Sequence, residues 1–432
     1  MTKGEKVKIG LMGLGTVGTG VVRLLRAHEA ELMAQTGMRL EIARILVKHP
    51  EKERSIYVPP HLLTADPEEL LEDESIHVIV EVIGGIEPTR TYIEKALKKG
   101  KHVVTANKDL MALYGAELLK LAAEKNCDLF YEASVAGGIP IIRTLVESFT
   151  ADRITKIMGI VNGTTNYILS KMTEEGISYE EALSEAKALG YAEADPTNDV
   201  EGYDAARKMA ILATLGFHVG IHLEDVAVEG ITHVEKTDIN YADALGYVIK
   251  LLGVAEREEE LTEVSVQPTL VPKSHPLASV SDSYNAVYVY GEAVGETMFY
   301  GKGAGELPTA TAVVADLVAV VKNMKLGVNG REQVFPYHKK KMKEEDQIFT
   351  RFYFRFTVKD QAGVLAKITN ILSQSGVSIA QIAQYPNQET QEAEILIVTH
   401  HASKKQVNQA IQTIGGMEEV KKAHSLFRVL KV

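Results

Sequence analysis

The sequence contains one cysteine and no tryptophan among its 432 residues. With Cys127 alone, neither a disulfide framework nor a cysteine-ligated metal site can form within one chain. No hydrophobic run approaches the length that a membrane span needs. The apolar run near the amino terminus is short and leads directly into a glycine motif, unlike a secretory signal. These absences predict a cytoplasmic protein.

The sequence also contains fewer basic than acidic residues. Lys and Arg together number 47 against 58 Asp and Glu, which gives a net charge of −11. Nucleic acids and anionic membranes repel such a protein, so neither is expected as a partner. The hydrophobic fraction of 45% and the charged fraction of 24% are typical of a soluble globular protein. The length allows two or three domains and a substantial core.

A glycine motif separates an apolar strand expected at 7–12 from a helix expected at 19–27. In a G-x-G-x-x-G loop the glycines allow a tight turn and bring backbone amides close to a pyrophosphate at the helix start. The alternative is an ordinary strand–turn–helix loop, but the position of the motif after the first strand favours a dinucleotide site. The motif residues are Gly13, Leu14, Gly15, Thr16, Val17 and Gly18.

The second strand is expected at 40–47, and its end indicates which cofactor is preferred. An NAD site usually places an acid here, on the ribose 2′-hydroxyl. This strand instead contains Arg44 and ends in Val47-Lys48-His49. Cations suit the 2′-phosphate of NADP(H), so we expect NADP(H) with NAD(H) still possible. The alternative is that Arg44 and Lys48 are plain surface charges.

Two further strands, expected at 76–83 and 102–105, end in residues suited to a ligand. Gly84 and Gly85 follow the first, whereas Thr105 ends the second and Lys108 precedes a helix expected from about 109 to 125. Ligands of open α/β sheets bind outside the carboxyl ends of the strands. A lysine at a helix amino terminus opposes the helix dipole, which suggests a specific role for Lys108. A solvated loop lysine is the alternative.

The strand expected at 128–133 leads into the loop 134–140, which has few side chains and many exposed carbonyls. Beside Glu132, such a loop can hold a hard monovalent cation through oxygen atoms. A tight loop joining two domains explains the same residues equally well.

The stretch 190–208 carries the strongest chemical signal in the chain. It opens with a loop containing Glu193, Asp195 and Asp199, in which Pro196 and Asn198 argue against helix. A carboxylate cluster beside a lysine can bind a substrate ammonium group and supply a proton.

A helix is expected from about 202 to 216, and it places Asp204 and Lys208 on one face. The other positions are mostly apolar, so the helix is expected to be buried, where charge is costly to desolvate. The alternative is an i,i+4 ion pair on a solvated stripe.

Beyond residue 140 the strand–helix alternation loosens. Strands are expected at 154–161, 264–271 and 286–294, the last two antiparallel, and a second glycine loop at 300–305 precedes an apolar helix at 309–324. This helix is expected to pack back on the first domain. Residues 331–350 are charged and without apolar period, as in a linker. The order of elements expected in 351–432 is βαββαβ, the ferredoxin-like order.

Five motifs together resemble the homoserine dehydrogenase family with a carboxyl-terminal ACT domain, over nearly the whole length. They are GLGTVG, TANK at 105–108, EASVAGGIPII at 132–142, NGTTNYI at 162–168 and GYAEADPTNDVEGYDAARK at 190–208. Residues 360–365, DQAGVL, resemble the first turn of an ACT domain. The resemblance implies three parts: a Rossmann-type dinucleotide-binding domain (1–140), an α+β substrate and dimerisation domain (141–330), and, after the linker 331–350, an ACT regulatory domain (351–432).

The resemblance also implies an activity and roles for individual residues. The activity is the NAD(P)-dependent interconversion of L-homoserine and L-aspartate 4-semialdehyde, a step in threonine, methionine and isoleucine biosynthesis. Lys208 would be the acid/base, supported by Asp204; Glu193, Asp199 and Lys108 would bind substrate. Further cofactor contacts would come from Gly84, Gly85, Thr105, Lys108, Gly163, Gly303 and Gly305. A sodium ion would lie at Glu132 and the carbonyls of Val135, Gly137 and Ile139.

Family members usually form dimers, so a homodimer or homotetramer is expected, and the ACT domain implies an amino-acid effector such as threonine. Two other functions remain open on the sequence. One is an NAD(P)-dependent enzyme acting on a different amino-acid aldehyde. The other is a non-catalytic amino-acid sensor, although the candidate catalytic residues are all present together.

Overall fold

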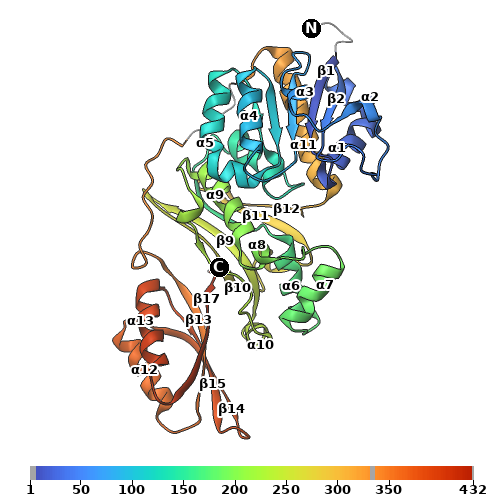
Figure 1. Cartoon of the computed structure of the whole chain (residues 1–432). Coiled ribbons are helices and arrows are strands. Elements are labelled where there is room, and N and C mark those ends of the chain that lie inside the picture. Colours follow the sequence, from blue (N-terminus) through green and yellow to red (C-terminus); the bar gives the residue numbers. More distant parts are fainter. Residues whose placement is uncertain (1–5, 331–335, 431–432) are drawn as a thin grey trace. The chain divides into compact units, whose positions relative to one another are not determined.

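The structure, a computed structural model, describes residues 6–330 and 336–430. The chain forms two compact units, each assembled from segments that are distant in sequence (Figure 1). Unit 1 comprises residues 1–163, 207–225 and 284–339, and unit 2 comprises residues 164–206, 226–283 and 340–432.

Unit 1 is built on a parallel six-stranded sheet with the order β3-β2-β1-β4-β5-β6. The order reverses between β1 and β4, which confirms the predicted Rossmann-type fold. The strands expected at 76–83 and 128–133 are shorter than predicted, because only their central residues pair. The strands are β1 (Lys6–Met12), β2 (Arg39–Leu46), β3 (Leu63–Thr64), β4 (Val78–Glu81), β5 (His102–Thr105) and β6 (Leu129–Phe130).

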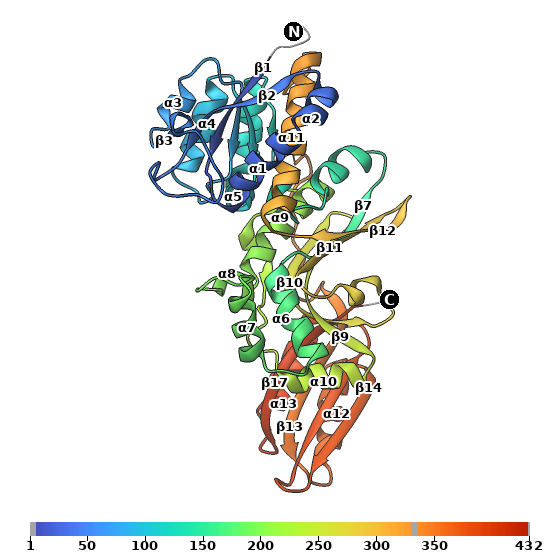
Figure 2. The same cartoon turned by 90° about the vertical axis from the view of Figure 1, so that its right-hand side faces the viewer.

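Helices cover both faces of this sheet, with α1, α2 and α11 on one face and α4 and α5 on the other (Figures 1 and 2). Helix α11 packs so closely on α1 that a Cβ added to Gly20 would lie 2.6 Å from the carbonyl oxygen of Glu306. The core of the unit therefore includes a helix from late in the sequence. The helices are α1 (Thr16–Ala27), α2 (Glu29–Thr36), α3 (Glu68–Leu71), α4 (Thr89–Lys98), α5 (Lys108–Glu124) and α11 (Glu306–Leu326).

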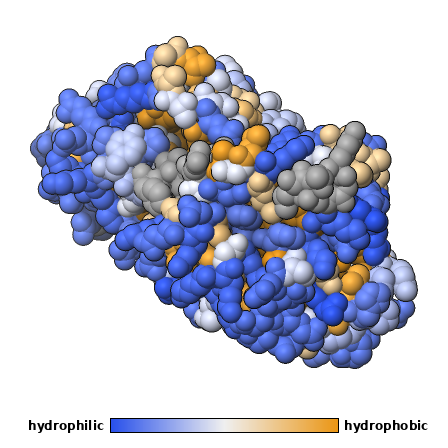
Figure 3. All heavy atoms as spheres, turned by 90° about the horizontal axis from the view of Figure 1, so that it is seen from above, coloured by the Kyte–Doolittle hydropathy of each residue, from blue (hydrophilic) through white to orange (hydrophobic). Residues whose placement is uncertain are grey.

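By length and composition alone, α11 could cross a membrane, which contradicts the prediction that no hydrophobic run approaches the length of a membrane span. Most of the helix is buried, and Val313, Leu317 and Val321 belong to the core that it shares with α1. The surface seen in Figure 3 is mostly hydrophilic. The burial of α11 accounts for its apolar composition as that of a core helix.

Unit 1 also contains an antiparallel sheet with the order β12-β11-β7. Helix α9 (Tyr203–Phe217) packs on it, since a Cβ added to Gly216 would lie 2.6 Å from the side chain of Ile157. Strand β12 was not expected; the predicted strand 286–294 ends at Gly291 and turns back. The strands are β7 (Ile154–Ile160), β11 (Tyr284–Gly291) and β12 (Gly295–Lys302).

Unit 2 contains a continuous sheet with the order β9-β10-β17-β13-β15-β14. Strands β17, β13, β15 and β14, with α12 and α13, form the expected ferredoxin-like arrangement. Strand β17 also pairs in parallel with β10, so this module continues the sheet of the preceding segment. The strands are β9 (Tyr247–Glu258), β10 (Leu261–Pro272), β13 (Phe349–Lys359), β14 (Ile379–Asn387), β15 (Glu392–Thr399) and β17 (Val420–Val429).

Two short strands and six helices complete unit 2. Strand β8 (Ala227–Val228) pairs with β10, and β16 (Ala402–Ser403) pairs with β13. The helices are α6 (Gly163–Glu174), α7 (Tyr179–Ala188), α8 (Thr197–Val200), α10 (Lys236–Ala244), α12 (Val364–Gln374) and α13 (Lys404–Gly415).

The segment predicted as a linker, 331–350, is partly attached to this sheet. Residues 331–335 lie outside the described residues. Beyond them, the amide of Thr262 donates to the carbonyl of Lys341, and the amide of Lys343 donates to the carbonyl of Thr262, both at 2.8 Å. The ammonium of Lys343 also lies 2.8 Å from Glu258. The charged residues of this part thus pair with β9 and β10 instead of forming a free tether, which corrects the linker interpretation for residues 340–348.

A buried arginine joins the ferredoxin-like module to α10. Arg355, on β13, is 2% exposed, and its guanidinium contacts Glu235, Asp238 and Glu394 at 2.6–2.8 Å. Asp238 is fully buried. Burial alone would raise the pKa of Glu235, but hydrogen bonds from Lys422 and Arg355 outweigh it and lower the pKa to about 2. The module is therefore fixed by charge as well as by strand pairing.

Candidate active site

The glycine loop after β1 contains two glycines that the protein itself requires and one that leaves space. Gly13 has a φ of +103°, and a Cβ added to Gly18 would lie 2.2 Å from the carbonyl oxygen of Gly13. In contrast, nothing lies within 4 Å of a Cβ added to Gly15. The backbone is thus open to a ligand at Gly15, where a dinucleotide site needs it.

The start of α1 suits an anion. No side chain caps this helix, and its first turn contains no acidic residue. The amide groups of this turn are therefore available to a pyrophosphate. Of the remaining motif residues, Leu14 is buried in the core, Val17 is half-buried and Thr16 is exposed.

The end of β2 is basic, but its cations differ in what they contact. Arg44 pairs with Glu69 at 3.1 Å, so its charge is partly neutralised within the protein. Lys48 is exposed just beyond the end of the strand. Arg54 joins this region through a 2.8 Å hydrogen bond to the carbonyl of His49. A 2′-phosphate at this place would meet Lys48 and Arg54 more readily than Arg44.

The turn after β4 is fixed by side chains from two neighbouring elements. Gly84 and Gly85 both have positive φ, at +81° and +74°. The hydroxyl of Thr89 donates to the carbonyl of Gly84 at 2.9 Å, and the side-chain amide of Asn107 donates to the carbonyl of Gly85 at 2.7 Å. Thr105 is fully buried, and its hydroxyl accepts the amide of Asn107. Together these residues form a rigid surface at the carboxyl ends of β4 and β5.

Lys108 is the first residue of α5, and it is half-buried. Asn107 caps this helix by accepting the amide of Leu110 at 3.0 Å. The next residue, Asp109, pairs with Arg207 of α9 at 2.8 Å. Both sequence neighbours of Lys108 are therefore held in place, one by the helix cap and one by an ion pair. A cation at the start of a helix is unfavourable because it opposes the helix dipole.

Lys208 and Asp204 lie one turn apart on α9, and both are buried, at 9% and 4% exposed. Burial excludes the solvated surface pair that the sequence left open. The Lys208 ammonium donates to the carbonyl of Val161 at 2.7 Å, just beyond the end of β7. The rest of the helix is mostly apolar, and of its three charged residues Asp204 and Lys208 are buried whereas Arg207 is half-buried. Such buried titratable groups are typical of functional sites.

The three acids of the adjoining loop have different surroundings. Asp195 accepts both the hydroxyl and the amide of Thr197, the first residue of α8, at 2.6 and 3.1 Å, and these bonds lower its pKa. It serves the local structure. Glu193 is exposed, and Asp199 is half-buried within α8. The helical turn α8 itself contradicts the expectation of a loop without helix, because Pro196 precedes the turn, where it is tolerated.

The loop that carries Glu193 is held by the first turns of α6. The hydroxyl of Thr164 donates to the carbonyl of Tyr191 at 2.6 Å. The rings of Tyr167 and Tyr191 lie 4.9 Å apart between centroids. The NGTTNYI motif thus supports the acidic stretch directly, a relation that the sequence motifs did not indicate.

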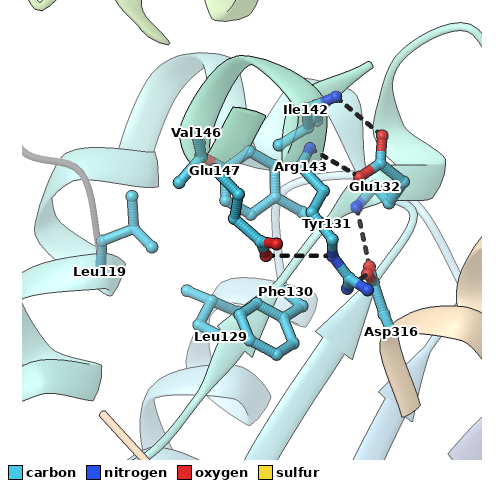
Figure 4. A pocket seen from close by; sticks show the side chains of 10 residues that line it. All are labelled: Leu119, Leu129, Phe130, Tyr131, Glu132, Ile142, Arg143, Val146, Glu147 and Asp316. Carbon is cyan, nitrogen blue, oxygen red and sulfur yellow. Dashed lines mark hydrogen bonds and ion pairs between the residues drawn. The ribbon is translucent and has the colours of Figure 1, made fainter. Parts of the chain in front are cut away.

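The side chain of Glu132 accepts hydrogen bonds from the main chain that follows the loop 134–140, as Figure 4 shows. Its carboxylate accepts the amides of Ile142 and Arg143 at 2.7 and 2.8 Å. Asp316 of α11 accepts the amide of Glu132 at 2.8 Å and the guanidinium of Arg143 at 2.7 Å. Burial raises the pKa of Asp316 to about 7 and raises that of Glu132. Main-chain amides and the neighbouring Asp316 therefore hold Glu132 in place at the start of the loop 134–140.

The loop that follows turns sharply, with φ of +55° at Ala136 and +46° at Gly137. No group of three or more His, Cys, Asp or Glu side chains suited to a metal occurs among residues 6–330 and 336–430. A cation here would be held by main-chain carbonyls, the oxygen ligands expected at Val135, Gly137 and Ile139. Hard monovalent cations accept such ligands.

The second glycine loop is explained largely by packing. A Cβ added to Gly303 would overlap the side chain of buried Asn285, and one added to Gly137 would lie 2.5 Å from the carbonyl oxygen of Gly303. Gly305 precedes α11 with a φ of +120°. Gly163 begins α6. Glycine is thus required at 303 without any cofactor.

Sequence reasoning missed three residues of this region: Glu81, Arg54 and Asn107. Glu81 ends the apolar run VIVE and is fully buried, so an acid inside a hydrophobic strand was the available signal. Asn107 lies in the TANK motif next to residues that were chosen. Arg54 gave no signal, because its link to His49 depends on the path of the loop between them.

Comparisons with known proteins agree along the whole chain. Residues 140–318 match the model of the homoserine dehydrogenase family, and residues 13–132 match that of the homoserine dehydrogenase NAD-binding domain. Residues 352–417 match the ACT domain.

Individual relatives extend these matches. The chain is 54% identical to homoserine dehydrogenase of Bacillus subtilis (strain 168) over 426 residues, 98% of each protein. It is similar to the crystal structure of a homoserine dehydrogenase from Thiobacillus denitrificans, with a TM-score of 0.94, 40% identity and full coverage of both chains. A hyperthermophilic archaeal homoserine dehydrogenase in complex with NADPH gives a TM-score of 0.63 at 28% identity, covering 76% of this chain and 100% of that one.

Proposed function

The chain belongs to the homoserine dehydrogenase family and interconverts L-homoserine and L-aspartate 4-semialdehyde as an NAD(P)-dependent oxidoreductase, and from this premise we propose that Lys208 is its general acid and base. The observation that carries the proposal is the burial of Lys208 on an apolar helix, with its ammonium 2.7 Å from the carbonyl of Val161. A buried, oriented lysine suits proton transfer.

The nicotinamide cofactor, when bound, supplies or accepts the hydride. The protein supplies the proton: Lys208 donates it to the aldehyde oxygen as that oxygen becomes the hydroxyl of homoserine, and it takes the proton back in the reverse direction. The carbonyl of Val161 holds the ammonium in place. Asp204, one turn earlier, supports the lysine through its negative charge. Lys108 lies between cofactor and substrate.

The substrate also carries an ammonium group, which needs negative charge. We propose that the carboxylates of Glu193 and Asp199 bind it, whereas that of Asp195 accepts the amide and the hydroxyl of Thr197. Charge-assisted hydrogen bonds of this kind are stronger than neutral ones and fix the orientation of the substrate. The same residues fit the aldehyde and the alcohol, as a reversible reaction requires.

For the cofactor we propose a preference for NADP(H), with NAD(H) accepted. The support is basic character at the end of β2, where Lys48 is exposed and Arg54 lies nearby. The residues proposed to hold the dinucleotide fit such a group, since the backbone at Gly15 is open and the first turn of α1 contains no acid.

Replacing Lys48 by alanine tests this preference. We expect the KM for NADPH to rise about 10-fold, the effect of losing one charge-assisted phosphate contact, while the KM for NADH stays the same. The measurement is NADPH and NADH oxidation with L-aspartate 4-semialdehyde. Lys99→Ala, an exposed lysine at the end of α4, is the control. Equal changes for the two cofactors would contradict the proposal.

We propose that the carbonyl oxygens of Glu132, Val135, Gly137 and Ile139 hold a sodium ion. It would supply a fixed positive charge that stabilises the turn at Ala136 and Gly137. The support is the strongly turned backbone at Ala136 and Gly137 and the fixed position of Glu132 at the start of this loop.

Sodium should then raise the thermal unfolding midpoint. At saturating sodium chloride we expect a rise of about 1–2 °C over choline chloride at the same ionic strength, from preferential binding to the folded state. Scanning calorimetry of the full-length protein measures this. An identical midpoint in the two salts would contradict a sodium site.

The ACT domain implies binding of an amino-acid effector, and we propose threonine as that effector. The module is joined to α10 and β10 by Arg355 and by strand pairing, so it is positioned to influence the rest of unit 2. We further propose a cytoplasmic homodimer or homotetramer. Sedimentation equilibrium of the intact protein tests the assembly, and a monomer would refute it.

A further inference from the structure

Glu81 is a buried carboxylate that no catalytic step uses. It is the last residue of β4 and is fully buried. One carboxylate oxygen accepts the amides of Ile83 and Gly84 at 2.7 and 3.0 Å, and the other accepts the hydroxyl of Thr105 at 2.5 Å. Burying a charge is costly unless several donors compensate it, as they do here.

The position of Glu81 in the sheet connects it to the cofactor site. It pairs in register with Met12 of β1 on one side and with Thr105 of β5 on the other. It therefore lies at the carboxyl ends of the strands, next to the point where the strand order reverses between β1 and β4. This is the place where ligands of such sheets bind.

The contacts of Glu81 complete the support of the glycine turn. Thr89 and Asn107 hold the carbonyls of Gly84 and Gly85, whereas Glu81 holds the amide of Gly84. Both glycines have positive φ and no side chain to fix them. Without these hydrogen bonds the turn would sample other conformations, because glycine is conformationally permissive.

We propose that Glu81 is a positioning residue for the nicotinamide end of the cofactor. Its carboxylate fixes the Gly84–Gly85 turn and Thr105 in their binding geometry before the cofactor arrives, so that less ordering accompanies binding. The inference rests on the proposed assignment of Gly84, Gly85 and Thr105 to the cofactor site. An apolar side chain would fill the same space, but it would leave three donors unsatisfied.

The test compares Glu81→Met with Glu81→Gln in the full-length protein. Methionine keeps the volume and loses the acceptors, whereas glutamine keeps an oxygen for the two amides. Two ligands are titrated: NADPH by its fluorescence, and 2′,5′-ADP, which lacks the nicotinamide half, by calorimetry. For Glu81→Met we expect NADPH binding to weaken about 10–100-fold, on the scale of unsatisfied buried donors, with 2′,5′-ADP changed less than about 2-fold. Glu81→Gln should restore NADPH binding to within about 5-fold of wild type, because it keeps one acceptor.

Asp128 provides a matched control in the same sheet, at the amino-terminal ends of the strands. It precedes β6, is buried, and accepts Asn323, Asn329 and the amide of Gly330 at 2.6–3.0 Å. Asp128→Leu should lower the unfolding midpoint and leave both ligand affinities within about 2-fold, since the site lies at the other strand ends.

The outcomes separate the two proposals. If Glu81→Met weakens NADPH and 2′,5′-ADP equally, or weakens neither, Glu81 does not position the nicotinamide end. If Glu81→Met does not fold, Thr105→Val removes the same hydroxyl donor, and unchanged NADPH affinity in that variant overturns the inference. Failure of the wild-type protein to bind NADPH at all would instead refute the proposed cofactor preference.

Discussion

Replacing Lys208 by methionine is expected to lower kcat by about 10²–10⁴-fold, the range that a positioned general acid contributes. The variant loses the proposed proton donor for the forming hydroxyl, while the residues proposed to hold the cofactor are untouched. NADPH should therefore bind with unchanged affinity. Steady-state oxidation of NADPH with L-aspartate 4-semialdehyde measures the first quantity, and NADPH fluorescence measures the second.

Lys250 is the matched control for this experiment. It is a second buried lysine, on β9, whose ammonium donates to the carbonyl of Val280 at 2.6 Å, and burial lowers its pKa to about 8. Its chemistry would suit proton transfer equally well. Lys250→Met should lower stability and leave kcat within about 10-fold, well short of a lost general acid. If Lys250→Met abolishes turnover and Lys208→Met does not, the assignment of the acid is wrong.

Arg355→Met is expected to lower the free energy of unfolding by about 3–5 kcal/mol, the usual result when one partner of a buried ion pair is removed. The reason is Asp238, which is fully buried and would lose its compensating charge. Urea unfolding followed by circular dichroism measures the change. In wild type, saturating L-threonine should raise the urea midpoint if the ACT domain binds it.

Two further variants distinguish the buried charge from lost packing. Arg351→Met, on the same strand, removes a single hydrogen bond to Thr399 and should cost less than about 1 kcal/mol. The double variant Arg355→Met/Asp238→Leu replaces both partners with apolar groups and should recover most of the stability. A double variant as unstable as Arg355→Met would show that the loss comes from packing alone.

Much of the fold was predictable because it is encoded locally. The motif at Gly13–Gly18 follows an apolar strand and runs into the first turn of α1, and short apolar runs marked the parallel strands. The ferredoxin-like order in 351–432 followed from alternating periodicities. These signals depend on neighbours in the sequence, so they survive without knowledge of the rest of the chain.

The parts that escaped prediction depend on distant partners. Glu81 appeared as the end of a strand, and its role emerges only from its contact with Thr105 on the neighbouring strand. The hydrogen bonds from the amides of Ile142 and Arg143 to the carboxylate of Glu132 join residues about ten positions apart, and no sequence pattern indicated them. The predicted division into consecutive ranges does not match units that are built from separated segments, because unit 1 joins residues 1–163, 207–225 and 284–339. The packing of α11 on the first domain, in contrast, was predicted.

The packing of α11 on α1 also constrains how the protein is made. The ribosome finishes α1 at Ala27 but reaches the end of α11 only at Leu326. At typical synthesis rates this interval of roughly 300 residues lasts on the order of 15–60 s. Throughout it, the apolar face of α1 lacks its native cover and is open to aggregation or to a chaperone. The nascent chain is therefore most vulnerable in its first domain, the part that emerges earliest.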